Sequence, residues 1–168
     1  MIMDFLRNNK VAAAVLTFLR VYIGWQWLTA GWGKITGEPF DASGYLNGVV
    51  ANESVQATYP TYHAFIENFA LPNAGIFSFM VAWGEFLVGL GLILGVLTTA
   101  AIFFGVVMNF AFMFAGTISS NPWLVLLSIF ILAAGHNAGK FGGDYWVVPY
   151  LRSKVFKNKQ ADSVTKAA

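Results

Sequence analysis

The chain has 168 residues, of which 57% are hydrophobic and only 11% are charged, whereas a soluble domain typically has about 25% charged residues. This composition predicts an integral membrane protein. The absence of cysteine excludes disulfides and cysteine-ligated iron–sulfur clusters. The net charge of +2 is small, and no basic run interleaved with aromatic residues suggests nucleic-acid binding.

The first apolar run, residues 11–33, is long enough to cross a membrane. It is longer than the roughly 7–15-residue core of a signal peptide, and Arg20 interrupts it, so we expect a retained helix. A cation near the middle of a span costs about 2.5–3.5 kcal/mol on insertion scales. The rest of the chain should therefore provide a partner for Arg20, and Glu85 is the best candidate. Residues 1–10 are expected to form a short segment at the membrane interface.

A polar connection follows the first span over residues 34–74 and contains three prolines. Within it, Thr61–Ala70 is predicted to be a short helix whose apolar face lies on the bilayer or the bundle.

Three further apolar runs predict spans at about 75–97, 100–117 and 122–137. Thr98 and Thr99 are expected to form the turn between the second and third spans. Asn121-Pro122 is a typical helix start, because proline is favoured at the first helical position. Residues 138–168 form a basic tail, and the predicted fold is a single all-α domain over residues 1–168, an up-down membrane bundle of four helices.

One face of the first span carries residues at the spacing of an interhelical seam, where glycines let a neighbouring helix approach closely. These residues are Arg20, Gly24, Trp27, Gly31 and Lys34. On the second span, Gly91 and Gly95 form a GxxxG pair. It is predicted to pack within the monomer, and dimerisation is the alternative.

The distribution of charge predicts that both termini are cytoplasmic, in the cell membrane. The connection has one lysine against four acids, whereas basic residues flank the first and fourth spans. These basic residues are Arg7, Lys10, Lys140, Arg152, Lys154, Lys157, Lys159 and Lys166.

Three polar residues, Arg20, Glu85 and Asn109, each lie near the middle of a predicted span. We expect Arg20 and Glu85 to form a buried ion pair, with Asn109 filling a remaining hydrogen-bonding position. Two interpretations remain open. The cluster either fixes only the helix register or binds a polar head group, such as a quinone carbonyl or a small anion.

Several aromatic residues are candidates for the wall of such a site. Trp25, Trp27, Trp32 and Trp83, together with Gln26, lie toward the outer half of the bundle. They form either an interfacial aromatic belt or a flat apolar wall for a ring-shaped ligand.

The two histidines are expected on opposite sides of the membrane, which excludes a bis-histidine haem within one monomer. His63 and Glu67 provide two ligands at most, so no metal site is predicted. His136 is interpreted as a cap or interface residue, with proton exchange as the alternative. Lys140 and Asp144 are expected to anchor the end of the fourth helix in a turn on the inner face.

The sequence resembles the DoxX/DoxD family of small four-helix membrane proteins. Three segments carry the resemblance: LRVYIGWQWLTAGWGKITG (19–37), WGEFLVGLGLILGVLTT (83–99) and AGHNAGKFGGDYWVVPYL (134–151). It implies a link to redox or oxidative-stress complexes, and the family takes its name from a subunit of a thiosulfate:quinone oxidoreductase. The motif positions it implies are Arg20, Lys34, Glu85 and Asp144.

The leading hypothesis is a quinone-linked oxidoreductase subunit resembling the thiosulfate dehydrogenase (quinone). Its candidate ligand-binding residues are Arg20, Trp27, Lys34, Trp83, Glu85 and Asn109, and its inner-face motif consists of His136, Lys140 and Asp144. No motif for a covalently bound cofactor is visible, so a dissolved quinone or a redox partner subunit would carry electrons. The alternative is a non-enzymatic membrane scaffold of a redox or stress complex, or a small-solute carrier. The lipid bilayer is the expected environment, and a homo-oligomer is compatible with the glycine pattern.

Overall fold

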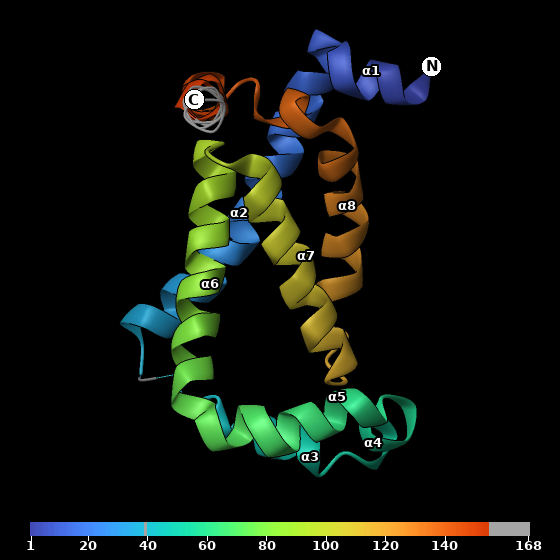
Figure 1. Ribbon diagram of the computed structural model, residues 1–168, viewed down its shortest axis with the longest axis vertical. Helices are drawn as coiled ribbons and strands as arrows, with labels where there is room; N and C mark the ends of the chain where they lie inside the picture. The colour runs from blue at the N-terminus through green and yellow to red at the C-terminus, as the bar shows by residue number, and fades with distance from the viewer. Residues whose placement is uncertain (39, 155–168) are drawn as a thin grey trace, which may run out of the picture.

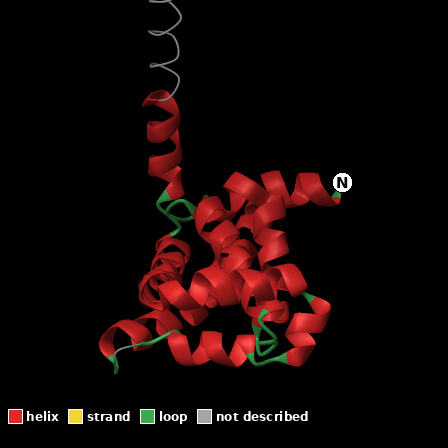
Figure 2. Cartoon of the chain, turned by 60° about the horizontal axis from the view of Figure 1, so that its bottom comes forward, coloured by secondary structure: helices red, strands yellow, loops and turns green. Residues whose placement is uncertain are grey.

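The computed structural model describes residues 1–38 and 40–154. Figure 2 shows helices and connecting loops, and no strand, in this described part of the chain. The principal elements are α1 (Ile2–Asn8), α2 (Lys10–Thr36), α3 (Ser43–Val50), α4 (Glu53–Thr58), α5 (Pro60–Phe65), α6 (Ala74–Leu94), α7 (Thr98–Phe114) and α8 (Asn121–Ala134). Shorter elements are a π-helical turn at Ile66–Ala70 and 3-10 turns at Leu71–Asn73 and Gly135–Gly139. Residues 144–154 are also helical.

The four long helices α2, α6, α7 and α8 run along the longest axis of the molecule (Figure 1). Three helical stretches are long and apolar enough to cross a membrane, namely Lys10–Thr36, Pro60–Leu94 and Asn121–Gly139. The shorter helix Thr98–Phe114 is also apolar. The predicted all-α membrane bundle is therefore confirmed.

The two ends of the bundle are built differently (Figure 1). Helices α3, α4 and α5 lie across one end, which we call the connection end. Helix α1 and the last described residues lie at the other, which we call the terminal end. Both ends of the described chain thus lie on one side of the bundle, as an even number of spans requires. Which side faces the cytoplasm stays a prediction, and Lys157, Lys159 and Lys166 lie outside the described residues.

Glycines bring α2 and α6 into close contact, as the seam spacing predicted. A Cβ atom at Gly31 would collide with the backbone of Phe86, and one at Gly89 would collide with the backbone of Leu28. A Cβ at Gly24 would come within 2.9 Å of the Leu92 side chain. These glycines therefore set the distance between the two helices.

The turn between α6 and α7 differs from the prediction. Thr98 and Thr99 belong to α7, and the turn is made by the residues before them. Gly95 ends α6 with a φ of +64°, a conformation that favours glycine, and Leu97 has a φ of +52°. The chain therefore reverses through two residues with left-handed backbone, Gly95 and Leu97, and not through the two threonines.

The other predicted boundaries agree closely with the structure. The predicted helix at Thr61–Ala70 is present as α5 and the π-helical turn that follows it. Helix α8 begins at Asn121 with a proline in its first turn. Helix α2 extends three residues beyond the predicted end of the first span, to Thr36.

Candidate functional site

An ion pair between Lys34 and Glu85 lies between α2 and α6. The Lys34 Nζ atom is 2.6 Å from the Glu85 Oε2 atom, which is a short charge-assisted hydrogen bond. The Glu85 side chain is 4% exposed and the Lys34 side chain 26%. The ammonium group also lies 5.4 Å from the centre of the Phe40 ring. Lys34 thus neutralises a carboxylate that is almost completely enclosed by the bundle.

The predicted pair between Arg20 and Glu85 is wrong. The Arg20 guanidinium packs against Gly95, which follows Glu85 by ten residues on the same chain segment, or about 15 Å of helix. Arg20 lies in the middle of α2 but is level with the end of α6. Arg20 and Glu85 would lie at the same depth only if the centres of the two helices did. The centres are offset, because α2 has 27 residues and α6 has 21, and α2 extends beyond the end of α6.

Arg20 instead belongs to a cluster at the terminal end, which we call the end cluster: Arg20, Gly95, Phe141, Gly142 and Asp144. The Arg20 Nη2 atom donates a hydrogen bond to the Phe141 carbonyl at 3.3 Å, and Asp144 is the carboxylate that attracts the guanidinium electrostatically. Both charged side chains are buried, at 2% and 4% exposure. A Cβ at either glycine would collide with the guanidinium.

Asp144 ties the α6–α7 turn to the segment that follows α8. Its carboxylate accepts hydrogen bonds from the backbone amides of Leu97, at 2.6 Å, and Thr98, at 3.0 Å. Its own amide donates to the Gly95 carbonyl at 2.7 Å. The carboxylate therefore caps the first turn of α7 from a distant part of the chain. These contacts explain the end cluster as a structural link between four segments.

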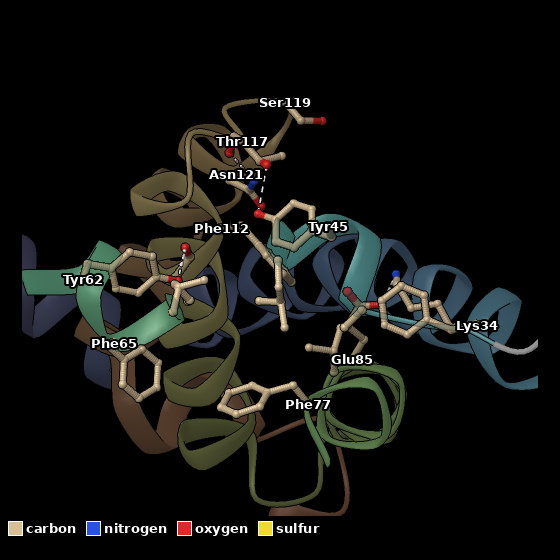
Figure 3. Close-up of a pocket in the computed structure, with 16 residues that line it drawn as sticks. Lys34, Tyr45, Tyr62, Phe65, Phe77, Glu85, Phe112, Thr117, Ser119 and Asn121 are labelled. Atoms are coloured by element: carbon tan, nitrogen blue, oxygen red, sulfur yellow. Dashed lines mark hydrogen bonds and ion pairs between the residues drawn. The ribbon is translucent and has the colours of Figure 1, made fainter. Parts of the chain in front are cut away.

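A cavity of about 470 Å³ lies beside the Lys34–Glu85 pair, within the volume range of about 300–1,000 Å³ that is typical of small-molecule sites. We call it the apolar cavity (Figure 3). Its walls come from α2, α3, α5, α6, α7 and the α7–α8 connection. Its lining is Lys34, Phe40, Ala42, Tyr45, Leu46, Tyr62, Phe65, Ile66, Phe77, Val81, Glu85, Ala111, Phe112, Thr117, Ser119 and Asn121.

Polar groups occur at three places in the apolar cavity, one of which is the Tyr62 hydroxyl, which donates a hydrogen bond of 2.9 Å to the Ala111 carbonyl. The Lys34–Glu85 pair lies on one side, while Tyr45, Thr117 and Asn121 lie on another (Figure 3). The Tyr45 hydroxyl shares a hydrogen bond of 3.0 Å with the Thr117 hydroxyl. Burial raises the pKa of the Tyr45 phenol above its usual value, so this hydroxyl stays protonated at neutral pH. Such an enclosure suits a ring-shaped molecule with polar substituents.

A second hollow of about 380 Å³ lies between α2 and the start of α8, and we call it the polar hollow. Its lining is Gln26, Trp27, Thr29, Ala30, Glu85, Phe112, Ser120, Asn121 and Leu124. Glu85, Phe112 and Asn121 line both spaces. Glu85 therefore stands between an apolar cavity and a polar one.

A family model described as DoxX matches residues 15–117, which is more than half of the chain. The chain belongs to the DoxX family. The match includes Lys34 and Glu85 but ends before Asp144, so two of the three resembling segments lie within it. Neither a search of curated proteins nor a search of solved structures gave a match.

The tryptophans of this DoxX-family protein fall into two groups. Trp27 is 4% exposed and lines the polar hollow. Trp25, Trp32 and Trp83 are 59%, 55% and 40% exposed on the surface of the bundle, so they do not form a wall around either space, and an aromatic belt stays a prediction. Trp83 lies edge-on against Phe86 and does not line either space.

Asn109 is completely buried on α7, and neither its side-chain oxygen nor its nitrogen has a hydrogen-bond partner. It does not join Glu85 at the apolar cavity, whose α7 wall is Ala111 and Phe112. Of the six predicted ligand-binding residues, the structure thus brings Lys34 and Glu85 together at the apolar cavity. Trp27 lies with Glu85 at the polar hollow.

The two histidines lie at opposite ends of the bundle, as predicted. The His63 Nε2 atom is 2.9 Å from the Val50 carbonyl, and its Nδ1 atom is 3.9 Å from the Glu67 carboxylate. His136 lies in the 3-10 turn after α8, and Lys140 follows that turn. No group of three or more histidine and carboxylate side chains is placed to hold a metal within residues 1–38 and 40–154.

Sequence reasoning missed Tyr45, Thr117 and Asn121 as lining residues. Tyr45 belongs to α3, which lies within the predicted polar connection, and the sequence predicts for Asn121 only that a helix begins there. The available signal was the helical spacing of Leu46 and Val49, three positions apart, which indicates that this short segment has an apolar face.

Proposed function

We propose that this DoxX-family protein is the membrane subunit of a quinone-linked oxidoreductase and binds a quinone in the apolar cavity. The observation that supports this most is a buried ion pair at the edge of a largely apolar, aromatic-lined space of about 470 Å³. A quinone combines a flat apolar ring with two carbonyl oxygens, and the Lys34 ammonium is a suitable donor to one of them.

In this proposal Lys34 and Glu85 replace Arg20 and Glu85 as the polar residues of the site. Lys34 donates to a carbonyl, Glu85 holds the ammonium in place, and the Tyr45 hydroxyl contacts the opposite side of the ring. Arg20 has a structural role in the end cluster, and the outward-facing Trp83 takes no part in binding. Thiosulfate as electron donor, a redox partner subunit and location in the cell membrane are further parts of the proposal, based on the resemblance to the thiosulfate:quinone oxidoreductase subunit.

The test is saturable binding of a short-tailed ubiquinone or menaquinone analogue to the purified protein, measured by quenching of tryptophan fluorescence. We expect Lys34→Met and Glu85→Gln to weaken binding at least about tenfold, the loss of one charge-assisted hydrogen bond. Trp83→Phe is the matched control and should bind like the wild type. Equal binding by all four proteins, or none by the wild type, would contradict the proposal.

The alternative is a carrier of small solutes or a scaffold without enzymatic activity. The carrier is favoured by one observation, namely that two spaces meet at Glu85 from different sides. Uptake of labelled thiosulfate into proteoliposomes that contain the protein, abolished by Lys34→Met, would support the carrier over the quinone site.

A further inference from the structure

The polar hollow has a lining that is unusual for a membrane protein. Gln26 and Thr29 are exposed on α2, and Ser120 is exposed at the start of α8. A glutamine amide that faced lipid would lose its hydrogen bonds to water, which is costly in hydrocarbon. Polar side chains at such depth typically face the inside of a bundle or a water-filled space. The side chains of the polar hollow therefore favour water over acyl chains as its content.

The polar hollow extends from the connection end of the bundle to Glu85, so water could reach Glu85 through it. Ser120 ends the α7–α8 turn at the connection end and Asn121 begins α8, whereas Gln26 and Trp27 lie deeper along α2. Glu85 lines the hollow from α6, and only 3% of this residue is exposed. A continuous lining thus extends from the turn at the membrane surface to the carboxylate.

The apolar cavity on the other side of Glu85 has a different lining from the polar hollow. Its walls are formed mainly by phenylalanine, tyrosine and aliphatic side chains. Phe112 separates the two spaces and lines both. Among the described residues that line either space, Lys34 and Glu85 are the charged ones, so the ion pair marks the boundary between them.

We infer that the polar hollow is an aqueous route that connects Glu85 with the water phase at the connection end of the bundle. The route extends the proposed function, because a quinone head group in the apolar cavity would exchange protons with that side of the membrane through Glu85. The route itself does not depend on any quinone being bound.

The inference can be tested by cysteine accessibility, because the chain contains no cysteine of its own. Gln26→Cys, Thr29→Cys and Ser120→Cys are introduced singly and reconstituted in liposomes of known orientation. A charged, membrane-impermeant methanethiosulfonate reagent is added to one side at a time. Trp25→Cys is the matched control, since Trp25 is next to Gln26 but lies on the bundle surface outside the polar hollow.

The reagent reacts with the thiolate, which forms only where water reaches the sulfur. We expect the three hollow positions to react at least about tenfold faster than Trp25→Cys, and only from the connection end. Rates at Gln26→Cys and Thr29→Cys as slow as at Trp25→Cys would overturn the inference, as would reaction only from the terminal end. A variant that fails to fold is recognised by its gel-filtration profile, and the remaining positions then decide.

The outcome is separable from the proposed function. If the three cysteines are accessible but no quinone analogue binds the wild type, the aqueous route stands and the quinone proposal fails. If the analogue binds but the cysteines are protected, the quinone site stands and the route is wrong.

Discussion

Lys34 and Glu85 meet at 2.6 Å across the α2–α6 seam, although 51 positions separate them in the sequence. Lys34 lies near the end of α2, and Glu85 lies near the middle of α6. The side chains meet because those of a helix point toward its N-terminus: Lys34 reaches back along α2, and Glu85 reaches back along the antiparallel α6. The pair thereby places one buried carboxylate between the apolar cavity and the polar hollow.

The first prediction concerns the strength of this pair. Lys34→Met leaves Glu85 buried without a partner and should lower the free energy of unfolding by about 3 kcal/mol, the lower end for breaking a buried pair, because Lys34 is partly exposed. The double change Lys34→Met/Glu85→Leu should recover much of this loss. Unfolding of the purified protein in mixed micelles measures both. Strictly additive losses would show that the two residues do not interact.

The second prediction concerns the end cluster. Asp144→Ala removes the acceptor of two backbone amides at the start of α7 and the carboxylate that attracts the buried Arg20 guanidinium, so it should lower the free energy of unfolding by at least about 2 kcal/mol. Because the end cluster is remote from Glu85, the effects of Asp144→Ala and Glu85→Gln should add within about 0.5 kcal/mol. A larger coupling energy would indicate that Asp144 in the end cluster and Glu85 in the Lys34–Glu85 pair interact energetically.

The third prediction compares two glycines of α2. Gly31→Ala places a Cβ against the Phe86 backbone and should destabilise the bundle by about 3 kcal/mol, the upper end of overpacking costs. Gly33→Ala has open space around the new atom and should be neutral or stabilising by up to about 1 kcal/mol, because alanine favours the helix. Thermal unfolding of the two variants under one detergent condition makes the comparison. Similar melting temperatures would contradict the close α2–α6 contact.

The fourth prediction compares two tryptophans. Trp27→Ala leaves a cavity at a buried position and should lower the free energy of unfolding by about 3–5 kcal/mol, whereas Trp83→Ala removes mainly the edge-on contact with Phe86 and should lower it by about 1 kcal/mol. The measurement is denaturant unfolding monitored by circular dichroism. Losses of equal size would mean that Trp83 is buried against another surface in the native protein.

Much of the architecture was predictable because it depends on local pattern. Apolar runs set the spans, and the glycines of α2 set the seam with α6. An even number of spans placed the described termini on one side. These features follow from residues near each other in the chain, such as Gly24 and Gly31.

The partners of the charged residues were not predictable in the same way. Arg20 and Glu85 both lie near the middle of their helices, but helix centres share a depth only if the helices begin at equal levels. Helix α2 starts well beyond the α6–α7 turn, so its middle lies beside Gly95 and its end lies beside Glu85. That offset is set by the packing of the glycines and by the segment around Asp144, which are contacts between distant parts of the chain.

We propose that the apolar cavity beside Lys34 and Glu85 holds the ring of a quinone. The most direct measurement is photo-crosslinking with an azidoquinone in membranes, followed by mass spectrometry of the labelled peptides. We expect labels on cavity-lining residues such as Phe77, Val81 and Phe112, and excess unlabelled quinone should suppress them. Labels confined to lipid-facing residues such as Leu87 and Phe103, without suppression by excess quinone, would contradict it.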